Sequence, residues 1–296
     1  MADIAITVDG GTTKKLLTAG KYCDRNIVVT ATGGGGEPEP PQDGKTRLYI
    51  HVPPNSEPGR PPARNQVPLY IQQTVSQGVT IDWGDGSEPE TLEGTGKVNT
   101  THIYQEGGDF VIALEVAEGC ELGLGHSSSL YCVMGGSRDD GLAYCGMLQK
   151  SVLGNGIVDV TSYAFSFCYS LSSVIISKPV KSIKSSAFRR CQSLPSIVIS
   201  EGITSIGSYA FSFCSSLCSV TIPKSVTEIV SFAFDSCEGV KEYHLKSTIP
   251  PSLSNSNAFN DISSDCIIFV PKGSLEAYQT ATNWSTYADK MQEEAS

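Results

Sequence analysis

The cysteines are the residues whose spacing first suggests chemistry. The chain has ten, and such a number could form disulfide bonds or bind a metal ion. Five recur at one interval of 23 residues: Cys145, Cys168, Cys191, Cys214 and Cys237. If each 23-residue repeat forms one coil and the coils stack, these cysteine side chains run parallel, and parallel side chains suit the disulfide torsion poorly. A buried free cysteine behaves as a small hydrophobe. We therefore expect inert core thiols at these five positions, the cysteine column, and the alternative is one or two disulfide bonds.

The other five cysteines lie outside the column, and sequence alone cannot pair them. They are Cys23, Cys120, Cys132, Cys218 and Cys266. No CxxC pair occurs and the four histidines are scattered, so the sequence predicts no metal site.

Two further residues have side chains suited to acid–base or metal chemistry. Asp85 lies in the Gly-rich turn of VTIDWGDGSEPE (79–90), and His102 lies in NTTHIYQEGGDFVIALEV (99–116). No serine, cysteine or second carboxylate is placed with either, and the GxSxG, P-loop and dinucleotide motifs are absent. We expect Asp85 to cap its turn and His102 to be a structural hydrogen-bonding partner. The sequence thus predicts a protein that is not an enzyme and needs no cofactor.

An internal repeat determines the elements that position these residues. The phrase SYAFSFC occurs at 162–168 and again at 208–214, and SSAFRRC stands halfway between them at 185–191. Alanine–phenylalanine pairs, cysteines, leucines and branched aliphatic residues all recur every 23 residues. One such coil cannot bury its apolar side chains alone, so neighbouring coils must stack around a continuous core. The repeat therefore predicts a solenoid.

Each coil contains one short stretch in which apolar residues alternate with small or polar ones, as in LSSVIIS, LPSIVIS and LCSVTIP. Such alternation predicts strands that stack as a parallel sheet, with Val174, Ile197 and Val220 facing inward. The AF phrase is expected on the opposite wall.

The outward side chains of these strands are the first candidate ligand-binding face. They are Ser173, Ile175, Ser196, Val198, Ser219, Thr221, Glu242 and His244. Exposed isoleucine and valine there imply either a ligand or cover by the C-terminal cap, the neighbouring domain or a sister subunit. Arginine and aromatic residues are common interface anchors, so the turn beside the AF phrase is the second candidate. It contains Phe167, Arg189, Arg190 and Phe213.

The repeats themselves resemble a known family. SVTEIVSFAFDSCEGV and GITSIGSYAFSFCSSLCSVTIPKSV are similar to the BspA-type leucine-rich repeats of bacterial surface proteins. The segment CIIFVPKGSLEAYQTATNW resembles the one that often closes such repeats. The resemblance covers residues 140–296 and implies a leucine-rich-repeat solenoid with a parallel sheet and a C-terminal cap, assigned to 119–296.

Two further resemblances concern the first part of the chain. Trp83, the turn after it, the THIY segment at 101–104 and the glycines ahead of Phe110 resemble a PKD-type immunoglobulin-like domain, which implies a β-sandwich at 46–118. LLTAGKYCDRNIVVTA resembles a small β-module of tail and other virion proteins of phages that infect Firmicutes. It implies a particle-attachment module at 1–33, followed by a Gly/Pro linker at 34–45. The alternative is an N-terminal β-hairpin with no assigned role.

Composition narrows the classes of partner. The net charge of −10 and the pI near 4.9 argue against nucleic acid or an anionic membrane as partner. The sequence has no run of 18 apolar residues, so no membrane span is expected. The stretch MADIAITVDG lacks the basic and apolar regions of a secretory signal, and this favours release by phage lysis.

Together these features predict a mainly β phage virion protein, tail or fibre-like, whose solenoid binds a glycan or protein on the host surface. Other virion proteins would be its partners through the N-terminal module, and it would be a homo-oligomer on the particle. Two alternatives stay open. One is a BspA-like bacterial adhesin, at the cell surface or secreted, and the other is a decoration protein displayed on a phage capsid.

Overall fold

A computed structural model describes residues 4–5, 16–17, 43–54, 65–126, 132–135, 144–176 and 180–295. The chain divides into two compact units, Met1–Gln42 and Asp43–Ser296. In the first unit, β1 (Ile4–Ala5) pairs antiparallel with β2 (Leu16–Leu17). The rest of the predicted N-terminal module, and residues 34–42 of the predicted linker, lie outside the described residues.

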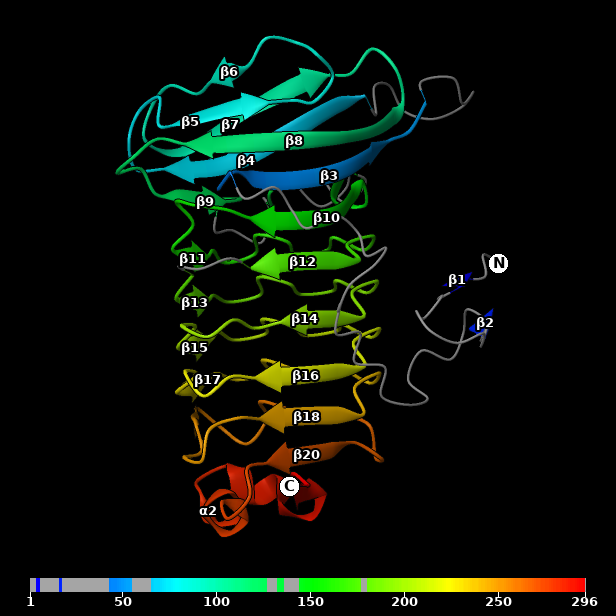
Figure 1. Cartoon of the computed structure of the whole chain (residues 1–296), viewed down its shortest axis with the longest axis vertical. Helices are drawn as coiled ribbons and strands as arrows, with labels where there is room; N and C mark the ends of the chain where they lie inside the picture. Colours follow the sequence, from blue (N-terminus) through cyan, green and yellow to red (C-terminus); the bar gives the residue numbers. More distant parts are fainter. Residues whose placement is uncertain are drawn as a thin grey trace, which may run out of the picture. The chain divides into compact units, whose positions relative to one another are not determined.

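The second unit begins with a two-sheet β domain (Figure 1). One sheet contains β3 (Thr46–Val52), β5 (Val79–Asp82), β6 (Glu90–Thr91) and β8 (Gly108–Val116). The other contains β4 (Gln66–Gln73), β7 (Gly96–Ile103) and β9 (Leu122–Leu124). Alternate residues of β3 and β4 are buried, so one face of each sheet contributes to the core, as the period-2 pattern requires. The immunoglobulin-like assignment and the boundaries at 46 and 118 stay predictions.

Asp85 and His102 have the structural roles expected from the sequence. The backbone N–H of Ser87 donates to Asp85 Oδ1 at 3.1 Å, which caps the turn, and His102 Nε2 lies 2.7 Å from Asp85 Oδ2. The His102 ring stacks on Trp83 with ring centroids 4.7 Å apart. Burial alone would raise the pKa of Asp85, but hydrogen bonds from His102 and Ser87 outweigh it and lower that pKa to about 2.

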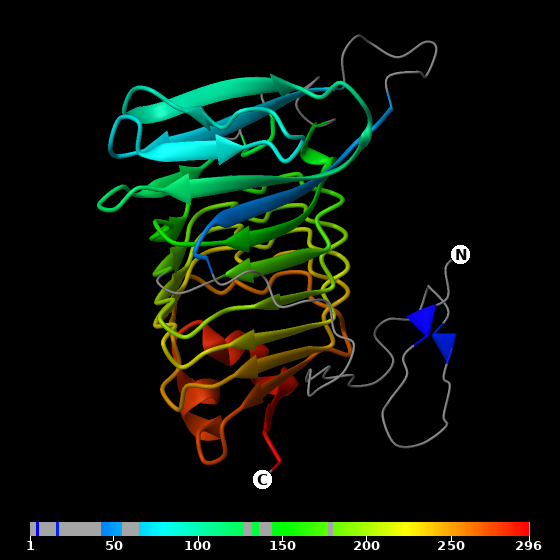
Figure 2. The ribbon, with the colours of Figure 1, turned by 45° about the horizontal axis from the view of Figure 1, so that its top comes forward.

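The repeats form a mainly β solenoid, as predicted (Figure 2). The sequence predicted one strand per coil, whereas the structure has two, which form a strand wall on each side. The first wall contains β12 (Ser173–Ile176), β14 (Ser196–Val198), β16 (Ser219–Ile222), β18 (Glu242–Leu245), β20 (Ile267–Val270) and β21 (Met291–Glu293). The second contains β11 (Asp159–Val160), β13 (Ser182–Ile183), β15 (Ser205–Ile206), β17 (Glu228–Ile229) and β19 (Ser252–Leu253). The pairing is parallel, and the predicted inward residues are buried, including Val174, Ile197 and Val220.

The AF phrases build the centre of the solenoid. Phe165, Phe188, Phe211, Phe234 and Phe259 are 0–1% exposed, and consecutive rings stack with centroids 5.2 to 5.3 Å apart. The alanine before each phenylalanine is 0% exposed. A larger side chain at these positions would push neighbouring coils apart. These residues form one continuous column of aromatic packing along the solenoid.

Backbone hydrogen bonds follow the same column. The N–H of Phe165 donates to the carbonyl of Ala187 at 2.8 Å, and the N–H of Phe188 donates to that of Ala210 at 2.8 Å. Two residues in each of these turns have positive φ, which turns alternate N–H groups toward the next coil. They are Tyr163, Phe167, Ser186, Arg190, Tyr209, Phe213, Phe232 and Ser236.

The two-sheet domain and the solenoid share a sheet. β10 (Leu148–Leu153) pairs parallel with β12 and antiparallel with β3, so the six-stranded order is β12-β10-β3-β8-β5-β6. A Cβ atom on Gly154 would lie 2.2 Å from the carbonyl oxygen of Gly44, so only glycine permits this approach. The two-sheet domain therefore covers the first coil of the solenoid.

Aromatic side chains cover the last coil. They come from α2 (Leu275–Thr280) and the 3₁₀ helix Trp284–Lys290. The rings of Trp284 and Tyr287 lie 5.5 and 5.6 Å from that of Phe259, and the Trp284 indole donates to the carbonyl of Pro251 at 2.7 Å. No helix in the described part of the chain is long and apolar enough to cross a membrane.

Removing one ring from the aromatic column should destabilise the solenoid. Phe211→Ala deletes a fully buried side chain that stacks on both neighbours, so we expect the free energy of unfolding to fall by about 3–5 kcal/mol. Urea unfolding followed by circular dichroism measures this. Val198→Ala, at a site 71% exposed, is the control and should change it by about 0.5 kcal/mol or less. Equal effects of the two changes would contradict the packing account.

Asp85→Asn should destabilise the chain at pH 7 by about 1 kcal/mol, because the carboxyl pKa is about 2 in the fold against 3.8 ordinarily and solvent screens part of the interaction. Because the pKa of Asp85 is lower in the folded chain than in the unfolded chain, its carboxylate stabilises the fold above the ordinary pKa. This stabilisation is lost as the pH falls toward 2. The difference between wild type and variant should therefore narrow between about pH 4 and pH 2, as thermal unfolding across that range would show. A difference that stays constant over this range would refute the assignment, and Glu118→Gln on an exposed turn is the control.

Candidate ligand-binding faces of the solenoid

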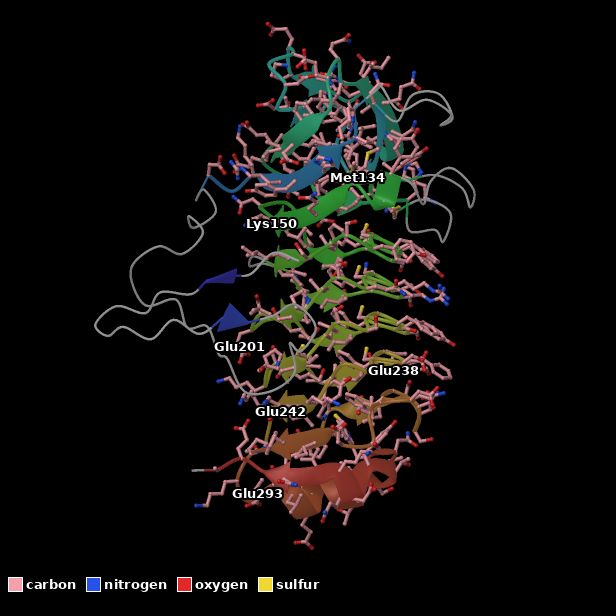
Figure 3. All side chains as sticks on the ribbon, turned by 90° about the vertical axis from the view of Figure 1, so that its right-hand side faces the viewer. Met134, Lys150, Glu201, Glu238, Glu242 and Glu293 are labelled. Carbon is pink, nitrogen blue, oxygen red and sulfur yellow. The ribbon has the colours of Figure 1, made fainter. Side chains whose placement is uncertain are left out.

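The first candidate face is the outer surface of the first strand wall. Strand register aligns Ser196, Ser219 and Glu242 in one row and Val198, Thr221 and His244 in another, and Ser173 and Ile175 hold the matching positions of β12. The rows contain the predicted residues Ser173, Ser196, Ser219 and Glu242, and Ile175, Val198, Thr221 and His244. Val198 is 71% exposed, and no residue of the described chain covers it. Figure 3 shows Lys150 and Glu242 on this wall and Glu238 on the opposite side.

The C-terminal strand occupies one end of this face. His244 Nδ1 lies 3.1 Å from Glu294 Oε1, His244 Nε2 lies 3.2 Å from Glu242 Oε2, and the His244 ring stacks on Phe269. Burial alone would raise the pKa of Glu294, but hydrogen bonds from Lys246 and His244 hold it below its ordinary value. Glu242 and His244 are therefore engaged within the fold, and the open part of the face surrounds Val198.

The second candidate, which we call the Arg–Phe cluster, consists of Phe167, Arg189, Arg190 and Phe213. The Cζ atom of Arg190 lies 5.6 Å from the ring centroid of Phe167 and 5.0 Å from that of Phe213. Arg189 Cζ lies 5.9 Å from each ring. Both guanidinium groups are thus held near the same two aromatic rings, within the range of cation–π attraction. In this cluster each of the two predicted arginines contacts both predicted phenylalanine rings.

The charge of the Arg–Phe cluster is not neutralised from within the described residues, where neither arginine forms an ion pair. The Nε atoms of Arg189 and Arg190 are buried and have no hydrogen-bond partner there. The side chains of Arg189 and Arg190 are half-buried, and each lies against the rings of Phe167 and Phe213. On a chain of net charge −10, two adjacent unpaired guanidinium groups form a localised positive site that suits a carboxylate or phosphate.

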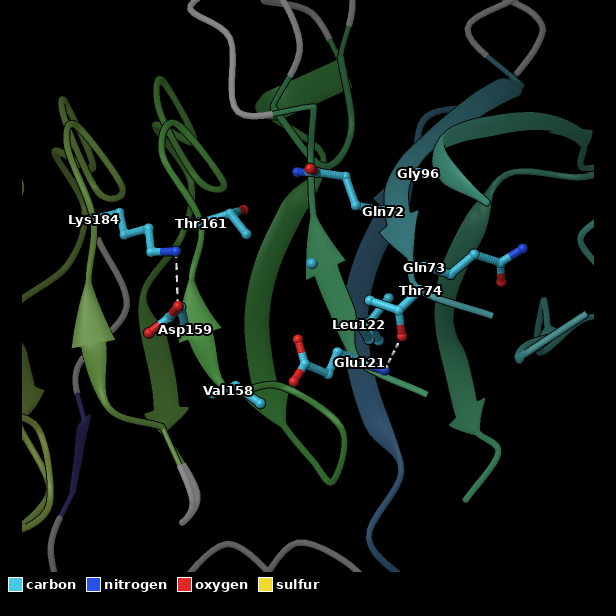
Figure 4. A pocket seen from close by; sticks show the side chains of 11 residues that line it. Gln72, Gln73, Thr74, Gly96, Glu121, Leu122, Val158, Asp159, Thr161 and Lys184 are labelled. Atoms are coloured by element: carbon cyan, nitrogen blue, oxygen red, sulfur yellow. Dashed lines mark hydrogen bonds and ion pairs between the residues drawn. The ribbon is translucent and has the colours of Figure 1, made fainter. Parts of the chain in front are cut away.

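An open pocket of about 220 Å³ lies between the sheet edge at β4 and β9 and the first coils (Figure 4). Its one described cation, Lys184, is 2.7 Å from Asp159 Oδ2, and the N–H of Glu121 donates to Thr74 Oγ1 at 2.8 Å. Two polar pairs thus lie within the pocket, while Gln73 Oε1 is buried without a hydrogen-bond partner in the described residues. No local sequence pattern marks this pocket, because its walls come from segments far apart in the chain.

The structure also brings together a group of buried thiols that no sequence pattern marks. Cys132, outside the cysteine column, lies with Cys145 and Cys168, and their Sγ atoms are all within 4.8 Å of one another. The column itself is buried as expected, and the thiols of Cys191, Cys214 and Cys237 donate to backbone carbonyls at 3.1 to 3.2 Å. No feature of the sequence pointed to this group, because Cys132 does not belong to the repeat.

Comparison with known proteins agrees with the fold. The family described as BspA type leucine rich repeat region matches residues 139–272 in six copies. No curated protein matches the sequence.

Three solved structures are similar to part of the chain. A leucine-rich repeat protein of T. pallidum shares 25% identity over 43% of this chain and 60% of its own, with a TM-score of 0.34. The pneumococcal vaccine antigen PcpA shares 17% identity over 50% and 34%, with a TM-score of 0.40. A leucine-rich repeat protein of Eubacterium ventriosum shares 17% over 39% and 43%, with a TM-score of 0.30. This chain covers less than two thirds of each of them. The 23-residue repeat and the stacked core of this part of the chain agree with the match of residues 139–272 to the BspA type leucine rich repeat region.

Proposed function

We propose that the chain is a surface-displayed adhesion protein whose solenoid binds a glycan or a protein on a cell surface. The observation that carries the proposal is the Arg–Phe cluster, which presents two unpaired guanidinium groups on a rigid scaffold. The stacked core supports it as well, because outward residues of a solenoid can vary without disturbing the packing. The BspA-type repeat region is in keeping with a protein at a cell surface.

The finer part of the proposal is where the protein is displayed. The resemblance of LLTAGKYCDRNIVVTA to a phage module supports a virion protein, attached through residues 1–33 and carrying the solenoid toward the host. The repeat region supports a bacterial adhesin equally well. Both placements, and display on a capsid, require the same property of the solenoid, namely recognition of a surface ligand.

Binding without catalysis is the role that we propose. Asp85 and His102 are the sequence candidates for acid–base chemistry. Asp85 accepts a hydrogen bond from the Ser87 N–H in its turn, and its other carboxylate oxygen contacts His102 Nε2. The acidic chain would not approach nucleic acid, so its partners would be host-surface glycans or proteins and, on a particle, other virion proteins. Assembly as a homo-oligomer would multiply the contacts, and weak single contacts would then give strong attachment.

Labelled full-length protein incubated with a panel of intact Gram-positive cells tests the proposal. The double variant Arg189→Ala and Arg190→Ala should bind at least ~10-fold more weakly than wild type, because arginine anchors contribute about 2 kcal/mol or more at such interfaces. Half-saturating concentration, read by flow cytometry, is the measurement. Val198→Glu tests the strand face in the same assay.

Lys224→Ala, at an exposed site on the solenoid, is the matched control and should bind as wild type does. Circular dichroism and the thermal midpoint must show that each variant is folded. Wild-type binding that survives both sets of changes would exclude the two candidate faces. Absence of wild-type binding across the whole panel would overturn the adhesion proposal itself.

A further inference from the structure

Three buried thiols meet where the two-sheet domain covers the solenoid. Cys132, Cys145 and Cys168 are 6%, 4% and 0% exposed, and their Sγ atoms all lie within 4.8 Å of one another. Lower in the column the thiols have a different arrangement, since Cys214 donates to the carbonyl of Phe188 at 3.1 Å and Cys237 to that of Phe211. The added cysteine at 132 is what distinguishes the upper end of the column.

The turn 132–135 fixes the position of Cys132. The carbonyl of Val133 accepts from the N–H of Tyr70 in β4 at 3.0 Å, and the N–H of Val133 donates to the carbonyl of Ala164 at 2.8 Å. The turn is thus bonded to the two-sheet domain on one side and to an AF phrase on the other. Figure 3 shows Met134 at this junction.

The donor atoms of this group are three sulfurs from three segments of the chain, the turn 132–135 and two successive coils. Cysteine binds metals as the thiolate, and soft sulfur ligands suit zinc and other thiophilic ions.

The spacing suits one metal ion. Zinc–sulfur bonds are about 2.3 Å long, so sulfurs that share a tetrahedral ion lie roughly 3.8 Å apart. The three Sγ atoms are within 4.8 Å, so shifts of about 1 Å or less would bring them onto one ion. Charge favours a divalent ion over a monovalent one, since it neutralises two of the three thiolates and a buried net charge is costly.

We propose that Cys132, Cys145 and Cys168 form a binding site for a thiophilic divalent metal ion such as Zn²⁺. Each thiol releases its proton to solvent as its sulfur binds the ion, and water completes the four-coordinate shell. The ion would tie the turn 132–135 to the first two coils and so fasten the two-sheet domain to the solenoid. This inference goes beyond adhesion and departs from the sequence expectation of no metal.

The test uses the full chain, purified under reducing conditions, freed of metal and then titrated with Zn²⁺ and Co²⁺. We expect one equivalent of Zn²⁺ per chain, and with Co²⁺ a thiolate-to-cobalt charge-transfer absorption. Cys132→Ala should lose both. Cys214→Ala, which removes a column thiol outside the group, should keep both. Zinc-edge X-ray absorption on the wild type should show three sulfur ligands at about 2.3 Å.

Three outcomes would overturn the proposal. One is folded, reduced wild type that binds no Zn²⁺, and a second is undiminished binding by Cys132→Ala. The third is protein isolated without reductant whose mass shows a disulfide within the group and which, once reduced, gives no cobalt absorption. Should Cys132→Ala fail to fold, the count of sulfur ligands in the wild type decides, because a bound ion with fewer than three sulfurs is not at this site.

Discussion

The stacking of one coil on the next is the interaction on which the rest of the structure depends. Each inner phenylalanine of the aromatic column, Phe188, Phe211 and Phe234, is buried between rings 5.2 to 5.3 Å away that the coils on either side supply. The stacking of coils also aligns backbone N–H groups with carbonyls of the following coil, as between Phe188 and Ala210. Packing and hydrogen bonding therefore reinforce each other at every repeat, and a single coil has neither.

A column of this kind needs a cover at each end, and the chain provides two different ones. At the first coil, β3 pairs with β10, so the two-sheet domain satisfies an edge that would otherwise be open to another chain. At the last coil, Trp284 and Tyr287 contact Phe259 and bond to loop carbonyls. The solenoid is thereby a closed object whose exposed surface is its two walls and turns, which is where a ligand can bind.

Periodic features of this fold were predictable from the sequence, and non-periodic ones were not. The inward position of Val220 follows from alternation, and the contact between Phe211 and Phe234 follows from their interval, because both depend on neighbours in a regular stack. The pairing of β3 with β10 joins segments about a hundred residues apart and has no counterpart in local pattern. The approach of Cys132 to the cysteine column was hidden for the same reason.

Differences between the repeats show which positions the packing does not determine. Phenylalanine and cysteine are unchanged at the centre of four successive turns, while the two left-handed positions of each turn carry Tyr, Ser and Phe, or Phe, Arg and Ser. A left-handed conformation costs a residue other than glycine roughly 1 kcal/mol, yet none of these eight positions is glycine. Cation–π contacts with Phe167 and Phe213 offset part of that cost at Arg190. Apart from Ser186, which is buried, the side chains at these positions are at least partly exposed, and their chemistry is available for recognition.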